Sequence, residues 1–220
     1  MRVVPNKFPA FERQEVVVHA PEHVLSIAEL APGQLELVAE AWRLRAEAAA
    51  AGGFPYVFAG VNEGRAAGAS LSHSHSQLIW LREEPPVPAN ETEAGRCRLC
   101  DYLTRERAET LRIVEERSGL VLLCPFGSRA PYECLLAPLE HESDAYASEL
   151  LGPALTVAAS ALGRLHEAEG PRPANLWLHP RHHWHVELVP RLTTFASLEL
   201  GAGHYVNPLS PEGAAETLRG

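Results

Sequence analysis

The sequence predicts an α+β protein of two tandem, related halves, each a strand-strand-helix-strand-strand unit, sharing a mostly antiparallel sheet. Two observations lead to this fold class. The segment VVPNKFPAFERQEVVVHAPEH, ending at His23, resembles LLCPFGSRAPYECLLAPLEH, ending at His141. Each segment is then followed by a helical stretch and by a strand that leads to a His-x-His motif, at residues 73–75 and 183–185.

The elements of each half follow from their residue patterns. Both segments join two strand-like runs through Pro-containing polar and aromatic turns. Residues 32–53 then space their apolar side chains by three and four and close on a Gly pair, which predicts a helix. Residues 142–170 are also mostly helical in pattern, with an expected break at Gly152-Pro153.

The two His-x-His motifs lie at matching positions of the repeat. His73-Ser74-His75-Ser76-Gln77 corresponds to His183-Trp184-His185-Val186-Glu187. In a strand, alternate residues share a face, so His73, His75 and Gln77 are expected to point the same way, with the serines facing away or bonding locally. The polar, Pro-rich residues 82–96 are predicted to be a linker between halves 1–81 and 97–220.

Composition excludes several classes of protein. The net charge of −9 over 220 residues lacks the basic footprint of a general nucleic-acid binder. No run of about 18 apolar residues suggests a membrane span, and the N-terminal residues lack the apolar core of a signal peptide. A cytoplasmic protein is therefore expected, in which a C-x-x-C pair indicates metal or redox chemistry more than a disulfide.

Cys97 and Cys100 have the spacing with which two thiolates bind one zinc ion from a single turn. His141 and His183, at matching repeat positions, are the candidates to complete a Cys2His2 set around Zn²⁺, with His182 as an alternative to its neighbour. Cys124 and Cys134 are expected to be ordinary core cysteines within strands.

Six stretches together make the chain similar to a known family. They are RVVPNKFPA, EVVVHAPEH, NEGRAAGASLSHSHSQ, CRLCDYL, HWHVELVPRLT and LELGAGHYVNPLSPEGAAETLR. Over nearly its whole length the chain resembles the galactose-1-phosphate uridylyltransferase-like branch of the histidine-triad superfamily. The resemblance implies two tandem histidine-triad-like halves, a homodimer, and transfer of a nucleoside monophosphate from a nucleoside-diphosphate sugar to a sugar 1-phosphate.

In that reaction the resemblance makes His75 the nucleophile, which forms a covalent nucleotidyl-histidine. Gln77 would stabilise the transferring phosphoryl group, and His73 would position His75. Glu199 falls where the family contacts the sugar acceptor. The expected nucleotide- and phosphate-binding residues are Asn6, Lys7, Phe8, Asn62, Gly68, Ser70, Ser74 and Gln77.

The chain departs from the family pattern at its start. It begins three residues before VPNKFP, where relatives carry an extension that often includes a further C-x-x-C. In the family that pair joins the positions of His23 and His73, so a first metal site is expected to be absent or incomplete here. Ser74 stands where a Pro is common in the family.

Two further functions remain open at this point. Water or inorganic phosphate as acceptor would make the protein a hydrolase or phosphorylase of nucleotide sugars or dinucleoside polyphosphates. Loss of turnover would leave a zinc-containing nucleotide-binding protein. The intact SHSHSQ motif favours the enzymes, because a binding protein does not need an imidazole aimed at phosphorus. The sequence does not choose between a uridine and an adenosine donor.

Overall fold

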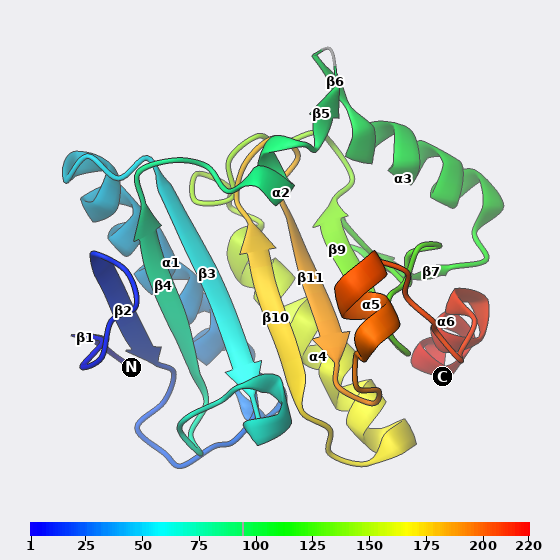
Figure 1. The fold of residues 1–220 in the computed structure, drawn as a ribbon, viewed down its shortest axis with the longest axis horizontal. Helices are drawn as coiled ribbons and strands as arrows, with labels where there is room; N and C mark the ends of the chain where they lie inside the picture. Colours follow the sequence, from blue (N-terminus) through cyan, green and yellow to red (C-terminus); the bar gives the residue numbers. More distant parts are fainter. Residues whose placement is uncertain (94) are drawn as a thin grey trace.

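The computed structural model describes residues 1–93 and 95–220 and contains a nine-stranded antiparallel sheet (Figure 1). The strand order is β1-β2-β4-β3-β10-β11-β9-β8-β7. These strands are β1 (Arg2–Pro5), β2 (Arg13–Val18), β3 (Tyr56–Glu63), β4 (His75–Leu81), β7 (Ile113–Arg117), β8 (Leu120–Leu123), β9 (Cys134–Pro138), β10 (Ala174–His179) and β11 (His185–Pro190).

The predicted repeat is visible in the order of the elements. The first half runs β1, β2, helix α1 (Pro32–Ala51), β3 and β4, and the second runs β8, β9, helix α4 (Leu151–Glu169), β10 and β11. The halves meet where β3 pairs with β10, from Ala59 opposite Leu178 to Glu63 opposite Ala174. The predicted α+β fold with a shared antiparallel sheet is confirmed, with β7 as an additional edge strand.

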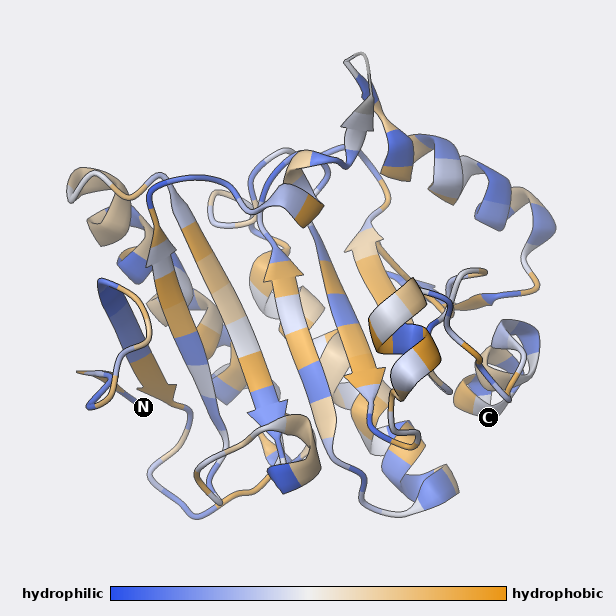
Figure 2. Ribbon diagram, in the orientation of Figure 1, coloured by the Kyte–Doolittle hydropathy of each residue, from blue (hydrophilic) through white to orange (hydrophobic). Residues whose placement is uncertain are grey.

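The two long helices cover one face of the sheet and pack against each other there (Figure 1). Alternation along β4 shows which residues face them: Ser76 accepts a hydrogen bond from the Trp42 indole of α1 at 2.9 Å, and Leu78 lies in the main core. His75 and Gln77 therefore face the opposite side of the sheet. Hydrophobic residues concentrate along the strands and on the sheet side of the helices (Figure 2).

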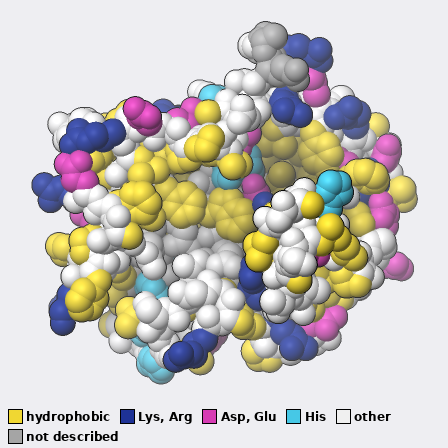
Figure 3. Space-filling model, viewed as in Figure 1, with side chains coloured by type: hydrophobic (Ala, Val, Ile, Leu, Met, Phe, Trp, Pro, Cys, Tyr) yellow, Lys and Arg dark blue, Asp and Glu magenta, His cyan; other side chains and the backbone are white. Residues whose placement is uncertain are grey.

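The helix-free face is partly covered in the second half. Leu103 of helix α3 (Arg98–Glu109) packs on Val121, Leu123 and Ala137 of β8 and β9, and helix α5 (Ser197–Ala202) lies in front of β11 in Figure 1. Figure 3 shows this face hollowed beside α5. The first half leaves its side of the face open, and that is where His75 lies.

Three local predictions were incomplete. Gly152 and Pro153 lie within the first turn of α4 rather than at a break. The N–H groups of a helix's first turn have no intrahelical acceptor, so a proline there loses no hydrogen bond. Helix α3 was not predicted. The expected linker 82–96 contains helix α2 (Pro86–Ala89) and strand β5 (Thr92–Glu93), which pairs with β6 (Arg96–Cys97).

The remaining elements are short. They are the 3-10 helices η1 (Ile27–Glu29) and η2 (Arg65–Ala67), and the C-terminal helix α6 (Pro211–Arg219). Helix α6 is tied to α3 by Arg112, which forms ion pairs with Glu106 and Glu212, both at 2.7 Å. Within the described part of the chain, every helix is too short or too polar to cross a bilayer.

Candidate active site and metal centre

His75 is the first residue of β4 and is almost fully buried. Its Nδ1 lies 2.7 Å from the His73 carbonyl oxygen, which can only accept a hydrogen bond. Nδ1 must therefore carry the proton, so the neutral ring has its lone pair on Nε2. This is the tautomer that a nucleophilic imidazole needs.

A cavity of about 430 Å³ lies beside the two histidines of the first motif. Its walls are mostly apolar, which suits a flat, weakly polar group such as a nucleobase. His73 and His75 both line this cavity, so a group seated in it would lie near both residues. The other lining residues are Met1, Arg2, Val18, Ala20, Pro21 and Leu71.

Gln77 and Asn62 lie near His75 on the open face. Gln77 pairs with Gly60 across β3 and β4, and Val61 pairs with Ser76, so the same register brings Asn62 level with His75. The Phe58 ring covers the position where a Gly60 side chain would stand, since a Cβ there would lie 2.8 Å from Phe58 Cε1. The arrangement can place amide donors around a group that reaches His75.

The Gly-rich segment after β3 forms a tight loop around η2. Gly64 and Gly68 have φ of 76° and 86°, the left-handed region that glycine adopts at no steric cost. Ser70 is exposed beyond this loop, between Gly68 and the His-x-His motif. The backbone N–H groups of residues 67–69 donate within the loop, to the Gly64 and Arg65 carbonyls, so they hold the loop together. The role of Gly68 and Ser70 in phosphate binding stays a prediction.

The serines of the motif face inward, which fits strand alternation but places Ser74 away from the open face, against its expected role in phosphate binding. Ser74 is buried, and its hydroxyl contacts Nδ1 of His19 at 2.9 Å rather than the open face. His73 donates from Nε2 to the Ala20 carbonyl at 3.0 Å. Its Nδ1 lies 3.4 Å from Nδ1 of His23, so the two histidines of the family's first metal position do lie together.

Two sets of predicted residues lie away from the His75 cavity in a single chain. Asn6, Lys7 and Phe8 form the turn between β1 and β2; the Asn6 side chain accepts the Phe8 N–H, and the Phe8 ring is exposed. Glu199 lies on α5, where its carboxylate accepts the Ala196 N–H at 2.9 Å. None of these four side chains lines the cavity.

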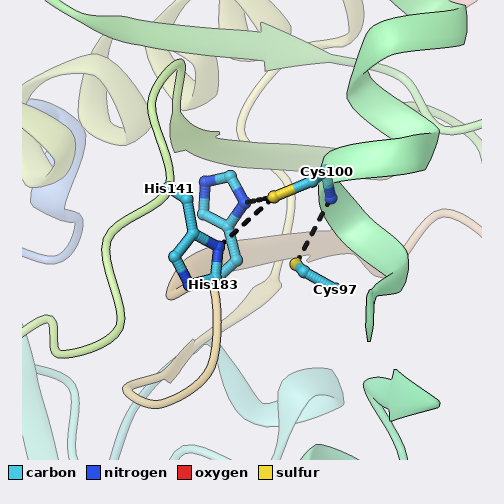
Figure 4. Close-up of side chains that lie close together, drawn as sticks. All are labelled: Cys97, Cys100, His141 and His183. Atoms are coloured by element: carbon cyan, nitrogen blue, oxygen red, sulfur yellow. Dashed lines mark hydrogen bonds between the residues drawn. The ribbon is translucent and has the colours of Figure 1, made fainter. Parts of the chain in front are cut away.

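The predicted metal ligands come together from three separate segments (Figure 4). Cys97 and Cys100 lie at the start of α3, His141 follows β9, and His183 precedes β11. The Cys100 sulfur lies 3.3 Å from Nδ1 of His141 and 3.2 Å from Nδ1 of His183. The neighbouring His182 instead bonds Glu84, so His183 is the ligand candidate.

The donor set fits a tetrahedral zinc ion. Zn–S bonds of about 2.3 Å and Zn–N bonds of about 2.1 Å give a tetrahedron with edges of roughly 3.6 Å, close to the observed separations. His183 also donates from Nε2 to the Pro138 carbonyl at 3.0 Å, which fixes its ring with Nδ1 toward the sulfurs. Burial and the Cys97 thiol raise the pKa of Cys100 to about 11, so a cation is needed to hold this pair as thiolates.

A second group of metal-ligating side chains was missed from the sequence. The donor atoms of Glu91, His179 and His185 lie within 4.8 Å of one another. Glu187 lies beside them, 3.5 Å from His179. Burial alone would raise the pKa of Glu187, but the bond with His185 and the Arg129 guanidinium hold it at about 2. Glu91 lies in the expected linker, which is why no pattern connected it to His185.

The chain is similar in sequence to known proteins. Residues 9–86 match the family described as galactose-1-phosphate uridyl transferase, N-terminal domain. The whole chain is 26% identical to an Arabidopsis thaliana ADP-glucose phosphorylase, of which it covers 74%. It is 29% identical, over 93% of its length, to a Thermotoga maritima galactose-1-phosphate uridylyltransferase, of which it covers 73%.

The fold agrees with solved structures as well. The Arabidopsis thaliana ADP-glucose phosphorylase with bound ADP-glucose superposes with a TM-score of 0.86 at 25% identity, covering 99% of this chain and 81% of that one. A uridylyltransferase structure superposes with a TM-score of 0.89 at 23% identity, again over 99% of this chain and 83% of that one.

Proposed function

Because the chain belongs to the galactose-1-phosphate uridylyltransferase-like branch of the histidine-triad superfamily, we propose that it is a nucleotidyltransferase acting through His75. The donor is a nucleoside-diphosphate sugar, and the acceptor is a sugar 1-phosphate. The observation that carries this proposal is the bond from His75 Nδ1–H to the His73 carbonyl, which leaves Nε2 as the free nucleophile.

In the first step, Nε2 of His75 attacks the α-phosphorus of the donor. A P–N bond forms, the bond from phosphorus to the bridging oxygen breaks, and the electron pair leaves with the sugar 1-phosphate. The imidazole becomes positively charged, and the His73 carbonyl stabilises that charge through the Nδ1 proton. The Gln77 and Asn62 amides donate to the phosphate oxygens as their charge redistributes.

In the second step, a phosphate oxygen of the acceptor attacks the same phosphorus. The P–N bond breaks and its electron pair returns to Nε2, so the enzyme is regenerated with no net proton transfer. Because one site serves two half-reactions in turn, the kinetics should be ping-pong. Initial rates measured over a grid of donor and acceptor concentrations should give parallel double-reciprocal lines, and intersecting lines would contradict the covalent route.

A second acceptor is favoured by a specific observation. The similarity to an ADP-glucose phosphorylase covers the entire chain. Inorganic phosphate in place of the sugar 1-phosphate would release a nucleoside diphosphate by the same chemistry. Product analysis of the wild-type protein with ADP- and UDP-sugars, supplied with either sugar 1-phosphate or phosphate, separates the two and identifies the base.

The Cys97, Cys100, His141 and His183 cluster is proposed to bind structural Zn²⁺. These four side chains would fill a tetrahedral coordination sphere, which is the closed arrangement of structural zinc sites and would leave no position for a substrate. The ion would supply folding energy by joining α3 to the ends of β9 and β11. None of the proposed chemical steps passes through it.

The protein is further proposed to be a cytoplasmic homodimer. Within one chain, the cavity beside His75 is lined by none of the predicted residues Asn6, Lys7, Phe8 and Glu199. A partner subunit could supply them if the site is shared between chains, as the family resemblance implies. Sedimentation at micromolar concentration should then give about twice the chain mass, and a monomer would rule out a shared site.

A further inference from the structure

The side-chain amides of Gln77 and Asn62 lie on the open face, and the oxygen of each accepts a hydrogen bond from another side-chain amide. These two donor residues are not among the predicted site residues. Gln77 Oε1 accepts from Gln14 Nε2 at 2.6 Å, and Asn62 Oδ1 accepts from Asn175 Nδ2 at 2.7 Å. A primary amide ends in one acceptor oxygen and one donor NH2. Because the oxygens are occupied, Gln77 and Asn62 have their NH2 groups left to offer, and these have no hydrogen-bond partner among the described residues.

The polarity of both pairs is fixed by the backbone, which cannot exchange donor for acceptor. The Ala10 N–H donates to Gln14 Oε1 at 2.9 Å, so Gln14 must turn its NH2 toward Gln77. The Ala67 carbonyl accepts from Asn175 Nδ2 at 2.8 Å, so Asn175 must turn its NH2 toward Asn62. If the side-chain amide of Gln77 or Asn62 were rotated by 180°, its NH2 group would face the NH2 group of its partner, and the hydrogen bond would be lost.

The two outer amides lie on either side of the His75 position. Gln14 is on β2, the neighbour of β4, and Asn175 is directly opposite Asn62 in the β3–β10 pairing. One outer amide thus comes from each half of the repeat. Asn175 also binds the loop that carries Gly68, so the second half contributes to the order of the predicted phosphate site.

We propose that Gln14 and Asn175 are positioning residues that hold the Gln77 and Asn62 amides with NH2 outward, toward the phosphates of the donor. Phosphate oxygens only accept hydrogen bonds, so an amide turned the other way would present its carbonyl oxygen and repel them. This inference rests on the proposed function, because it takes the phosphates to bind beside His75.

The test reverses the polarity of each outer amide with little change in shape. In Gln14→Glu, one carboxylate oxygen still accepts the Ala10 N–H, while the other draws the NH2 of Gln77 inward. Asn175→Asp does the same to Asn62 and also loses its bond to Ala67. Because a hydrogen bond to a charged phosphate is lost and a carbonyl replaces it, the affinity for ADP and UDP should fall about tenfold or more.

Neutral variants of similar volume separate orientation from packing. Gln14→Met and Asn175→Leu leave the inner amides free to rotate, so they can still donate, and the loss of affinity should be smaller than in the acidic variants. A packing role alone would rank the variants the other way, because the acidic side chains preserve the shape of the native ones.

Double mutants separate orientation from simple charge repulsion. In a Gln77→Ala background, Gln14→Glu should change affinity by no more than about twofold, and Asn175→Asp should behave likewise in Asn62→Ala. Calorimetric titration with ADP and UDP provides the affinities, and the single-turnover rate of nucleotidyl transfer provides the second readout.

The outcomes are distinguishable from a failure of the proposed function. A reactive wild-type protein whose nucleotide affinity is unchanged in both acidic variants would overturn this inference alone. The same losses in the alanine backgrounds would also overturn it, because charge would then account for them. A wild-type protein that neither binds these nucleotides nor reacts with nucleotide sugars would overturn the proposed function, and this inference with it.

Discussion

His19 lies directly behind the His-x-His motif and is fully buried. Its backbone N–H donates to the Ser74 carbonyl at 3.2 Å, and its ring Nδ1 contacts the Ser74 hydroxyl at 2.9 Å. In the chain, Ser74 lies between His75 and His73, whose carbonyl accepts the hydrogen bond from His75 Nδ1. Burial, with the nearby His75 and His73, lowers the pKa of His19 to about 3, so it acts as a neutral hydrogen-bonding group throughout the physiological range.

His19→Leu should therefore misalign His75 more than it weakens nucleotide binding. Removal of the ring contact frees Ser74, and small errors in the attack geometry are costly, so the rate of nucleotidyl transfer should fall about tenfold with nearly unchanged nucleotide affinity. His19→Asn should restore much of the rate, because its amide nitrogen can occupy the Nδ1 position. Equal single-turnover rates in the two variants would contradict this role.

Residue-scale prediction from sequence was strong where a motif had a fixed spacing. The C-x-x-C pair and the repeated histidine positions led to a ligand cluster that the structure brings together. Gln14, His19 and Asn175 could not be found this way, since each acts only through a partner that lies far away in the chain. What links these residues to the site is the pairing of neighbouring strands, and that pairing is known only from the folded sheet.

Helix α3 begins at the metal cluster, with Cys97 as its N-cap. Cys97→Ser should lower zinc content and stability together, because the hydroxyl can still cap the helix but is a poor zinc ligand. Elemental analysis and a thermal melt of the same sample test this, with Cys124→Ser as the control that removes a thiol outside the cluster. Undiminished zinc in Cys97→Ser would remove this cluster as the binding site.

Glu63, at the end of β3, joins the 3-10 helix η1 to the sheet by accepting the Ile27 N–H at 2.6 Å. Burial raises its pKa from 4.5 to about 7. A raised carboxyl pKa means that the folded state favours the protonated form. The free energy of unfolding should therefore fall as pH rises from about 4.5 to 7, by about 2–3 kcal/mol, and stay reduced above that range.

Glu63→Gln should remove this slope, because the amide oxygen still accepts the Ile27 N–H and no proton is lost. Urea unfolding at several pH values between 4 and 8 measures it, and Glu22→Gln, at an exposed carboxylate, should keep the wild-type slope. Parallel pH profiles for the wild type and Glu63→Gln would show that Glu63 does not titrate with folding.

At the scale of elements, the repeats predicted the strands and long helices well, because two copies of one pattern support each other. Helix α3 and strand β7 have no counterpart in the first half, and no repeat could indicate them. The expected linker is polar and Pro-rich in sequence, yet two of its residues contact the second half: Glu84 bonds His182, and Glu91 bonds His179. Burial of that pair depends on tertiary contacts that composition does not record.

The two halves form one core, because α1 and α4 pack together and β3 is bonded to β10. Hydrogen bonds also cross between them, as in the Tyr146 hydroxyl to the Val57 carbonyl at 2.8 Å. A shared core predicts a single cooperative unfolding transition. The chain offers a probe in each half, since Trp42 and Trp80 lie in the first and Trp177 and Trp184 in the second.

Variants with the tryptophans of one half replaced by Phe should each unfold at the same urea concentration by fluorescence as by far-UV circular dichroism. Replacement lowers the stability of each variant, so the comparison is made within a variant rather than between variants. A fluorescence midpoint separated from the circular dichroism midpoint would show that the halves unfold independently.

The most direct test of the central claim, a covalent nucleotidyl-His75, is the intact mass of the protein after brief incubation with nucleoside-diphosphate sugars. The reaction is stopped in alkali, because phosphohistidine bonds are labile in acid. The proposed mechanism predicts a gain of one nucleoside monophosphate that is lost on adding the acceptor and is absent in a folded His75→Ala variant. The same adduct in His75→Ala, or turnover in that variant, would contradict it.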